Sequence, residues 1–145
     1  MKNALPTLAL LLISVVVRGA ELPLSIQALI PRHANVDWHS TIEWNENEKV
    51  AVFYYLPEIG RNNVTKYIEF FALSEDGGAK ALDRVYLGGR GDNTIDKISE
   101  NQESILIQAR EHQGSDPIST PTKRTLITIK HTDIPVSVSK SYPKK

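Results

Sequence analysis

Hydrophobic and polar positions alternate with a period of two along most of the chain after residue 37. Val50, Val52 and Tyr54 fall on one face of such a segment, and Ala51 and Phe53 on the other. Alternation in runs rich in β-branched and aromatic residues is typical of β-strands. No segment after residue 37 carries a long apolar stripe at helical spacing. The pattern therefore predicts an all-β fold.

Turn residues divide this pattern into eight expected strands, over residues 38–44, 49–56, 65–74, 79–88, 93–99, 103–112, 123–132 and 134–140. The clearest boundary lies at residues 74–78, where Asp76-Gly77 supplies the positive φ angles of a tight hairpin turn. On the fourth strand, alternation places Leu82 on the face opposite Val85. Before the first strand, Pro23 and Pro31 bracket an apolar run that predicts either a strand or one or two helical turns.

The eight expected strands form two similar halves. Short matches such as Thr41-Ile42-Glu43 with Thr94-Ile95-Asp96 recur at offsets of 53 to 58 residues. They predict two four-stranded antiparallel meanders, packed as a small sandwich or as two propeller-like blades. Two blades cannot close a ring, so the sheets must pack on each other or form one curved sheet. Alternatively, the matches reflect only what any two antiparallel β segments share.

A meander also fixes where its loops lie, because successive connections alternate between the two ends of a sheet. One end receives the short turns at residues 45–47, 75–78, 101–102 and near 133. The other end receives the longer loops at residues 57–64, 88–92 and 112–122. Long loops on a rigid scaffold are the usual place for binding, although such loops can also be merely tolerated.

Consecutive aromatic residues raise a question about the second strand. Phe53, Tyr54 and Tyr55 must place rings on both of its faces. Either both faces are covered by the rest of the protein, or one presents an aromatic patch to a partner. Most aromatic residues of the chain, Tyr86 among them, are expected in the core.

The first 20 residues have the features of an export signal. Lys2 precedes an apolar run from Leu5 to Val17, and small residues allow cleavage after Gly19 or Ala20. An uncleaved amino-terminal anchor is the alternative. We expect residues 21–145 to form a single β domain. The chain contains no cysteine, and a small exported domain without disulfides favours the bacterial periplasm.

Composition excludes several classes of function. The 17 Lys and Arg residues equal the 17 Asp and Glu residues in number, so a nucleic-acid binder that relies on a basic surface is not expected. The lack of cysteine excludes thiolate nucleophiles and cysteine-ligated metals. The four histidines do not pair at metal-ligand spacing. Asp92, Thr94 and Asp96 alternate as calcium ligands do, but the rest of a calcium-loop signature is missing.

Catalytic signatures are also missing from the sequence. It has no Gly-x-Ser-x-Gly elbow, and no spacing selects one pair of carboxylates for glycoside hydrolysis. We expect no enzymatic activity, no cofactor and no metal site. The remaining expectation is a protein that binds a partner.

In overall plan the chain resembles the periplasmic immunity proteins that protect bacteria from type VI secretion effectors attacking peptidoglycan. The resemblance lies in the export signal at residues 1–20, the compact mature domain, the all-β pattern and the polar loops at one end. Many such proteins are lipoproteins, whereas this chain lacks a lipobox cysteine. The resemblance implies an inhibitor that occludes the cleft of a cell-wall hydrolase of the muramidase type.

Under this interpretation the polar residues of the longer loops contact the hydrolase, with forked hydrogen bonds from arginine and ion pairs from the acidic residues. The candidate partner-binding residues are Glu58, Arg61, Asn62, Asn63, Arg90, Asp92, His112, Gln113, Ser115 and Asp116. The alternative function is an envelope structural or adhesion module that recruits a neighbour through exposed strand edges.

Overall fold

The computed structural model describes residues 21–44, 47–58, 60, 63–117 and 120–144. The expected signal peptide, residues 1–20, lies outside the described residues. One short helix precedes eight strands: α1 (Leu24–Gln27), β1 (Asn35–Trp44), β2 (Asn47–Pro57), β3 (Val64–Leu73), β4 (Ala79–Gly89), β5 (Asn93–Glu100), β6 (Ser104–Glu111), β7 (Lys123–Lys130) and β8 (Ser137–Ser141). The all-β prediction is confirmed.

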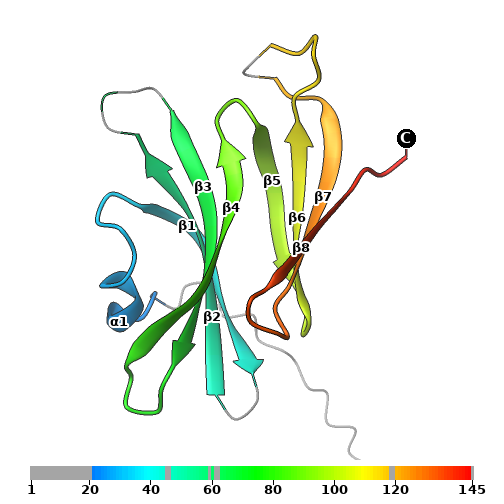
Figure 1. Ribbon diagram of the computed structural model, residues 1–145. Helices are drawn as coiled ribbons and strands as arrows, with labels where there is room; N and C mark the ends of the chain where they lie inside the picture. Colours follow the sequence, from blue (N-terminus) through cyan, green and yellow to red (C-terminus); the bar gives the residue numbers. More distant parts are fainter. Residues whose placement is uncertain (1–20, 45–46, 59, 61–62, 118–119, 145) are drawn as a thin grey trace, which may run out of the picture.

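The strands form two four-stranded antiparallel sheets, in the orders β1-β2-β3-β4 and β5-β6-β7-β8. Each sheet is a meander and corresponds to one of the halves expected from the sequence. The two sheets face each other as a sandwich (Figure 1). β8 begins at Ser137, three residues later than expected, and the preceding Pro135 lacks the N–H that a ladder position requires.

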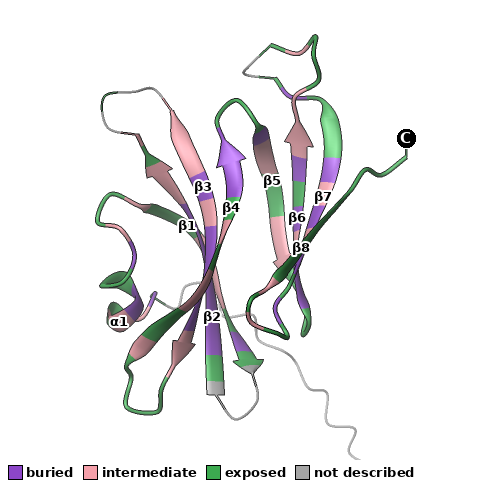
Figure 2. Ribbon diagram, in the orientation of Figure 1, coloured by how far each residue is buried: buried purple, intermediate pink, exposed green. Residues whose placement is uncertain are grey.

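The main core lies between the two sheets (Figure 2). Ala51 and Phe53 of β2 and Phe70 of β3 meet Ile107 of β6 and Ile127 of β7 there, and all five are at most 1% exposed. These side chains come from alternate positions, which is why the period of two predicted their face. Burial of such side chains supplies the main favourable term in folding.

The outer face of the first sheet is also covered, which answers the question raised by the aromatic run. Val50, Val52 and Tyr54 of β2 form a second apolar cluster with Ile26 of α1 and with the segments on either side of it. The hydroxyl of Tyr54 donates to Glu69, 2.8 Å away. Burial, aided by this bond, raises the pKa of Tyr54. Tyr54 is fully buried, so it presents no aromatic patch to a partner.

A β-bulge corrects one assignment of faces. Phe70 pairs with Asp83 and Phe71 with Ala81, so Leu82 has no partner in this ladder. A one-residue shift moves a side chain to the opposite face of a strand. Leu82 therefore packs against the same core as Val85, and the expectation that the two residues face opposite ways is wrong.

Two buried lysines on the inner face of the first sheet reach across to other parts of the sandwich. Lys49 of β2 donates to the backbone carbonyl of His131, which follows β7. Lys66 of β3 donates to the carbonyls of Gly89 and Asn93, at 2.6 Å and 2.9 Å. Both lysines are at most 4% exposed, and burial lowers the pKa of each. Their ammonium groups satisfy buried carbonyls near opposite ends of the sandwich.

Candidate functional site

The described residues of the three longer loops, which span residues 57–64, 88–92 and 112–122, lie at the same end of the sandwich, as predicted (Figure 1). We call them the long-loop end. Hydrogen bonds join neighbouring loops: the Arg90 N–H donates to Asn63 Oδ1 at 3.2 Å, and the His112 N–H donates to the Asp92 carbonyl at 3.4 Å. The three loops therefore form one connected surface.

The first loop is closed by two of the candidate residues. The Glu58 N–H donates to the Asn63 carbonyl at 3.0 Å, and the Asn63 side-chain amide donates to Glu58 Oε1 at 3.0 Å. Asn63 Oδ1 also accepts from the Val64 N–H. Asn63 thus holds its own loop and the adjacent turn together. Arg61 and Asn62 lie outside the described residues.

The turn between β4 and β5 is organised by Asp92. Its Oδ2 accepts hydrogen bonds from the Gly89 N–H at 2.6 Å and from the Tyr86 hydroxyl at 3.3 Å. Gly88 adopts a φ of +115°, and a Cβ on it would lie 2.9 Å from the Asn93 amide nitrogen and 3.0 Å from the Asp92 Cβ. Only glycine fits this backbone and this space. Arg90, at the tip, is exposed.

The third loop is closed by Asp116. Its carboxylate accepts from the backbone N–H of Gln113 at 2.9 Å, and from the N–H and hydroxyl of Thr122 at 3.0 Å and 2.9 Å. The bond from Gln113, followed by those from Thr122, lowers the pKa of Asp116. The Gln113 side chain also donates to the Thr122 hydroxyl, whereas Ser115 is exposed.

Below this end, a groove of about 430 Å³ runs between β4 of one sheet and β8 of the other. We call it the β4–β8 groove. Its lining residues are Tyr86, Leu87, Gly88, Gly91, Asp92, Asn93, Glu111, His112, Ile127, Val138 and Lys140. Lower on β4, Asp83 accepts a hydrogen bond of 2.8 Å from the Val136 N–H, which ties the segment before β8 to β4.

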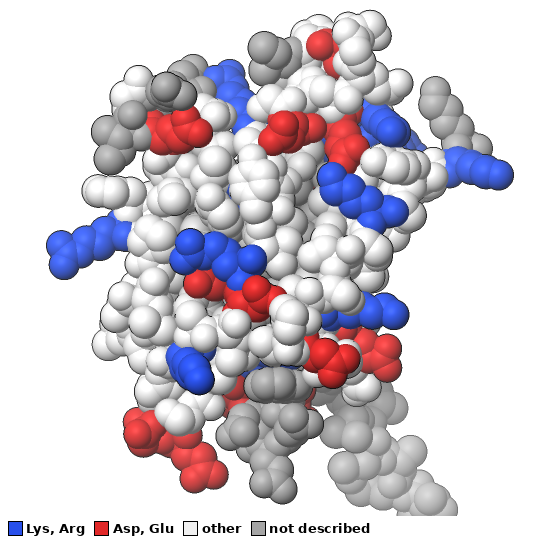
Figure 3. Space-filling view, in the orientation of Figure 1, with Lys and Arg blue, Asp and Glu red and all other residues white. Residues whose placement is uncertain are grey.

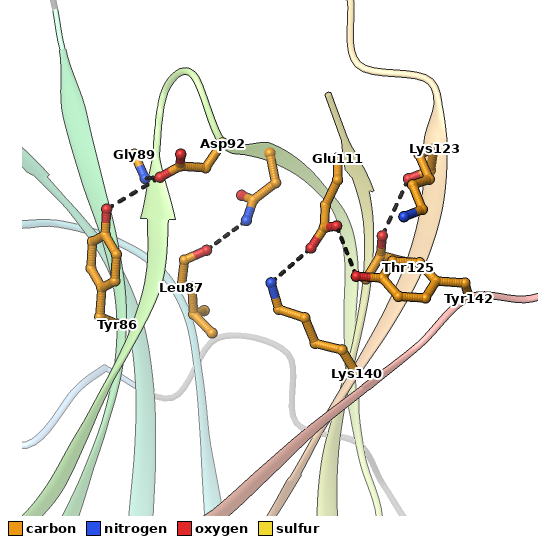
Figure 4. Close-up of polar contacts among 10 residues, drawn as sticks. Tyr86, Leu87, Gly89, Asp92, Glu111, Lys123, Thr125, Lys140 and Tyr142 are labelled. Carbon is orange, nitrogen blue, oxygen red and sulfur yellow. Dashed lines mark hydrogen bonds and ion pairs between the residues drawn. The ribbon is translucent and has the colours of Figure 1, made fainter. Parts of the chain in front are cut away.

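A polar network occupies the β8 side of this groove (Figure 4). Glu111 accepts from the Lys140 ammonium at 2.7 Å and from the Tyr142 hydroxyl at 3.3 Å. The bond to Glu111 raises the pKa of Lys140. The Lys123 ammonium lies 3.7 Å from the centre of the Tyr142 ring, a cation–π arrangement. The cations on this side of the groove are therefore already engaged.

Two buried polar atoms belonging to residues that line the groove have no hydrogen-bond partner among the described residues: Oδ1 of Asn93 and Nε2 of His112. Asn93 is only 3% exposed, and its amide nitrogen donates to the Leu87 carbonyl at 2.6 Å. Buried polar atoms in native proteins are normally paired. Both atoms have less than 1 Å² of accessible surface, so neither is presented to the groove.

Sequence reasoning found the loop end but missed the groove. Tyr86 was expected in the core, whereas it is 56% exposed. Tyr86 lies two positions after Arg84, so both side chains share one face of β4. The charge of Arg84 was the available signal that this face is exposed to solvent. No signal connects Glu111 with Lys140, because these residues are 29 positions apart in sequence and β7 lies between their strands.

Metal-ligating groups, surface charge and apolar helices complete the description. The described residues contain no group of three or more His, Asp or Glu side chains that could hold a metal. Asp96, one of the alternating acids, is held by Arg110, with a shortest contact of 2.7 Å. Acidic and basic side chains are interspersed on the face shown in Figure 3. Within the described ranges, no helix is long and apolar enough to span a membrane.

Comparison of the chain with protein-family models, with curated proteins and with solved structures gave no match.

Proposed function

We propose that this protein is a periplasmic immunity protein that inhibits a secreted peptidoglycan hydrolase of the muramidase type. In this proposal the long-loop end enters the hydrolase cleft and blocks access to the glycan. The observation that carries the proposal is the union of three loops into one surface by the bonds from Arg90 to Asn63 and from His112 to Asp92. Binding residues lie disproportionately on loops that a rigid scaffold positions.

Internal bonding prepares these loops for binding. Asn63, Asp92 and Asp116 each tie backbone groups of their own loop. A surface ordered before binding loses less conformational entropy when the complex forms. The three residues therefore favour binding by fixing the shape of their loops, in addition to any contact that they make with the partner.

The chemistry of the end suits a hydrolase cleft. In Figure 1 the turn between β4 and β5 stands between the other two loops, and its tip carries Arg90 and Gly91, both exposed. A muramidase cleft is concave and contains catalytic carboxylates. An arginine at an exposed turn can form forked hydrogen bonds to such carboxylates.

A bulky substitution at the tip tests the proposal. A Cβ on Gly91 would meet no atom within 4 Å, so Gly91→Trp should leave the fold intact and change stability by less than about 0.5 kcal/mol. We expect it to weaken binding to the proposed peptidoglycan hydrolase by at least about tenfold, and to abolish inhibition of peptidoglycan clearing. Glu75→Trp, in an exposed turn at the opposite end, is the matched control.

Three results would contradict the proposal. One is that Glu75→Trp abolishes binding while Gly91→Trp does not, which would place the contact at the short-turn end. The second is the absence of any hydrolase gene beside this one, and the third is full-length protein retained in the cytoplasm. The proposal expects a periplasmic protein that begins at Ala20 or Glu21.

A further inference from the structure

Four strands lie at the edges of the two sheets: β1 and β4 in the first sheet, and β5 and β8 in the second. An edge strand leaves a row of backbone N–H and C=O groups without a partner strand, and native proteins usually protect such edges from pairing with another chain. A β-bulge is one form of protection, because it twists the edge and interrupts its ladder.

Three of these four edge strands contain a bulge. Asp37 of β1, Leu82 of β4 and Asp96 of β5 each have no partner in the ladder with the adjacent strand. By contrast, β8 pairs with β7 in one unbroken register over Ser137–Ser141. It contains no proline, and all five of its residues are exposed (Figure 1). Among the described strands, β8 is therefore the edge that is left open to pairing.

The charge on this edge does not prevent pairing. A charged side chain on an edge strand can block association, and β8 carries Lys140. Its ammonium is held by Glu111 at 2.7 Å, so the charge is compensated within the chain. Val138, two positions away on the same face, is 47% exposed. One face of β8 thus presents an exposed apolar side chain beside a compensated cation.

We propose that β8 pairs with β8 of a second copy of this chain, in antiparallel orientation about a two-fold axis through Ser139. This axis places Ser139 of one copy opposite Ser139 of the other, and Val138 opposite Lys140. No like charges are then opposite each other, and the methylene groups of Lys140 cover the exposed Val138. An axis through Lys140 would instead place two ammonium groups opposite each other, which is unfavourable.

A second copy suits this edge because the strand has the same pattern in both directions. Serine occupies positions 137, 139 and 141, so reversal about the axis matches each of these positions with serine. Two-fold dimers, in which the same surface of both copies is used, are the commonest soluble homo-oligomers. The pairing joins the two second sheets into one continuous sheet. It does not depend on the function proposed above, because β8 lies outside the three loops.

The expected association is weak, since a strand of five residues makes an interface of less than about 1,200 Å² in total. We expect a dissociation constant on the order of 100 µM. Sedimentation equilibrium of the mature protein, from about 10 µM to about 1 mM, should therefore show a monomer–dimer equilibrium.

Charges placed on the axis test where the two copies meet. Ser139 is exposed, so Ser139→Glu and Ser139→Lys should leave the circular dichroism spectrum unchanged. In a dimer of either variant, two like charges face each other, which should weaken dimerisation about fivefold or more. In an equimolar mixture of the two variants, the new carboxylate faces the new ammonium, and association should recover to at least the native strength.

Thr41→Glu and Thr41→Lys are the matched controls, because Thr41 is an exposed position on β1, an edge that carries a bulge. Each should dimerise as the native protein does. Native protein that stays monomeric at the highest concentration overturns the inference, and so does a Ser139→Glu variant that dimerises as tightly as the native protein.

Two further outcomes also count against this pairing. If both Ser139 variants are monomeric and their mixture does not recover association, the axis does not pass through Ser139 and the assigned pairing is wrong. If the native protein is monomeric and Ser139→Glu weakens binding to the proposed hydrolase, the edge of β8 serves the hydrolase and not a second copy.

Discussion

His131 is a titratable side chain held inside an apolar sandwich. It is 1% exposed, its ring lies 6.1 Å from that of Phe70, and its Nε2 has no partner among the described residues. Lys49 donates to its backbone carbonyl. Burial, followed by the charge of Lys49, lowers the pKa of His131. The folded protein therefore keeps this ring neutral at a pH where the unfolded chain accepts a proton.

This difference predicts that acid destabilises the fold through His131. Below the ordinary histidine pKa of about 6.5, the unfolded state binds more protons than the folded state, so the free energy of unfolding falls as pH falls. One such group contributes at most about 1.4 kcal/mol per pH unit. We expect His131→Leu to reduce the loss of stability between pH 7 and pH 5, measured by urea denaturation at each pH.

His33→Leu is the control for this prediction, because His33 is exposed. It should leave the pH dependence of the native protein unchanged. If His131→Leu shows the same decline with falling pH as the native protein, another group is responsible for that decline and the role given to His131 is wrong.

At the scale of elements, α1 and the segments beside it act as a cover for the first sheet. Ile26 is fully buried against Val50, Val52 and Phe71. Leu24, two positions earlier in the same helix, is 81% exposed. A four-residue helix has little stability of its own, so its position depends on the burial of its apolar side chains.

A pair of alanine substitutions within this helix tests its role. Ile26→Ala removes a buried side chain and leaves a cavity, so it should lower the free energy of unfolding by about 2–5 kcal/mol. Leu24→Ala should change it by less than about 0.5 kcal/mol. Both values come from chemical denaturation of the mature protein. Equal effects would mean that α1 does not cover the sheet in solution.

The strands were predictable because their signal is local. Alternation identifies a strand and its faces within a few residues, and Asp76-Gly77 marks a hairpin in which Gly77 adopts a φ of +83°. The face of Leu82 was not predictable, since a bulge depends on the register with β3. The choice of a helix for residues 24–27 depended on apolar partners in β2 and β3, which the local sequence does not contain.

The candidate site was predictable in its location and not in its details. Alternation of connections in a meander places the three loops together without any knowledge of side chains. It does not say that Asn63, Asp92 and Asp116 accept hydrogen bonds from their own loops. The groove was hidden for the same reason, because Asp92 and Lys140 become neighbours only when the two sheets pack.

At the scale of the whole molecule, the two sheets share one core, and this predicts that they unfold together. Both tryptophans, Trp38 and Trp44, are in β1, so tryptophan fluorescence reports on the first sheet and, through Trp38, on its packing against the shared core. Ile127 of β7 is 1% exposed within the shared core, and Ile127→Ala should cost about 2–5 kcal/mol. If folding is cooperative, this change in the second sheet moves the fluorescence midpoint in urea as far as the far-ultraviolet circular dichroism midpoint. The opposite result is a fluorescence transition that stays at its native midpoint while the circular dichroism signal splits into two steps. It would mean that each sheet is stable by itself, and that the apolar contacts between the sheets do not hold the first sheet together.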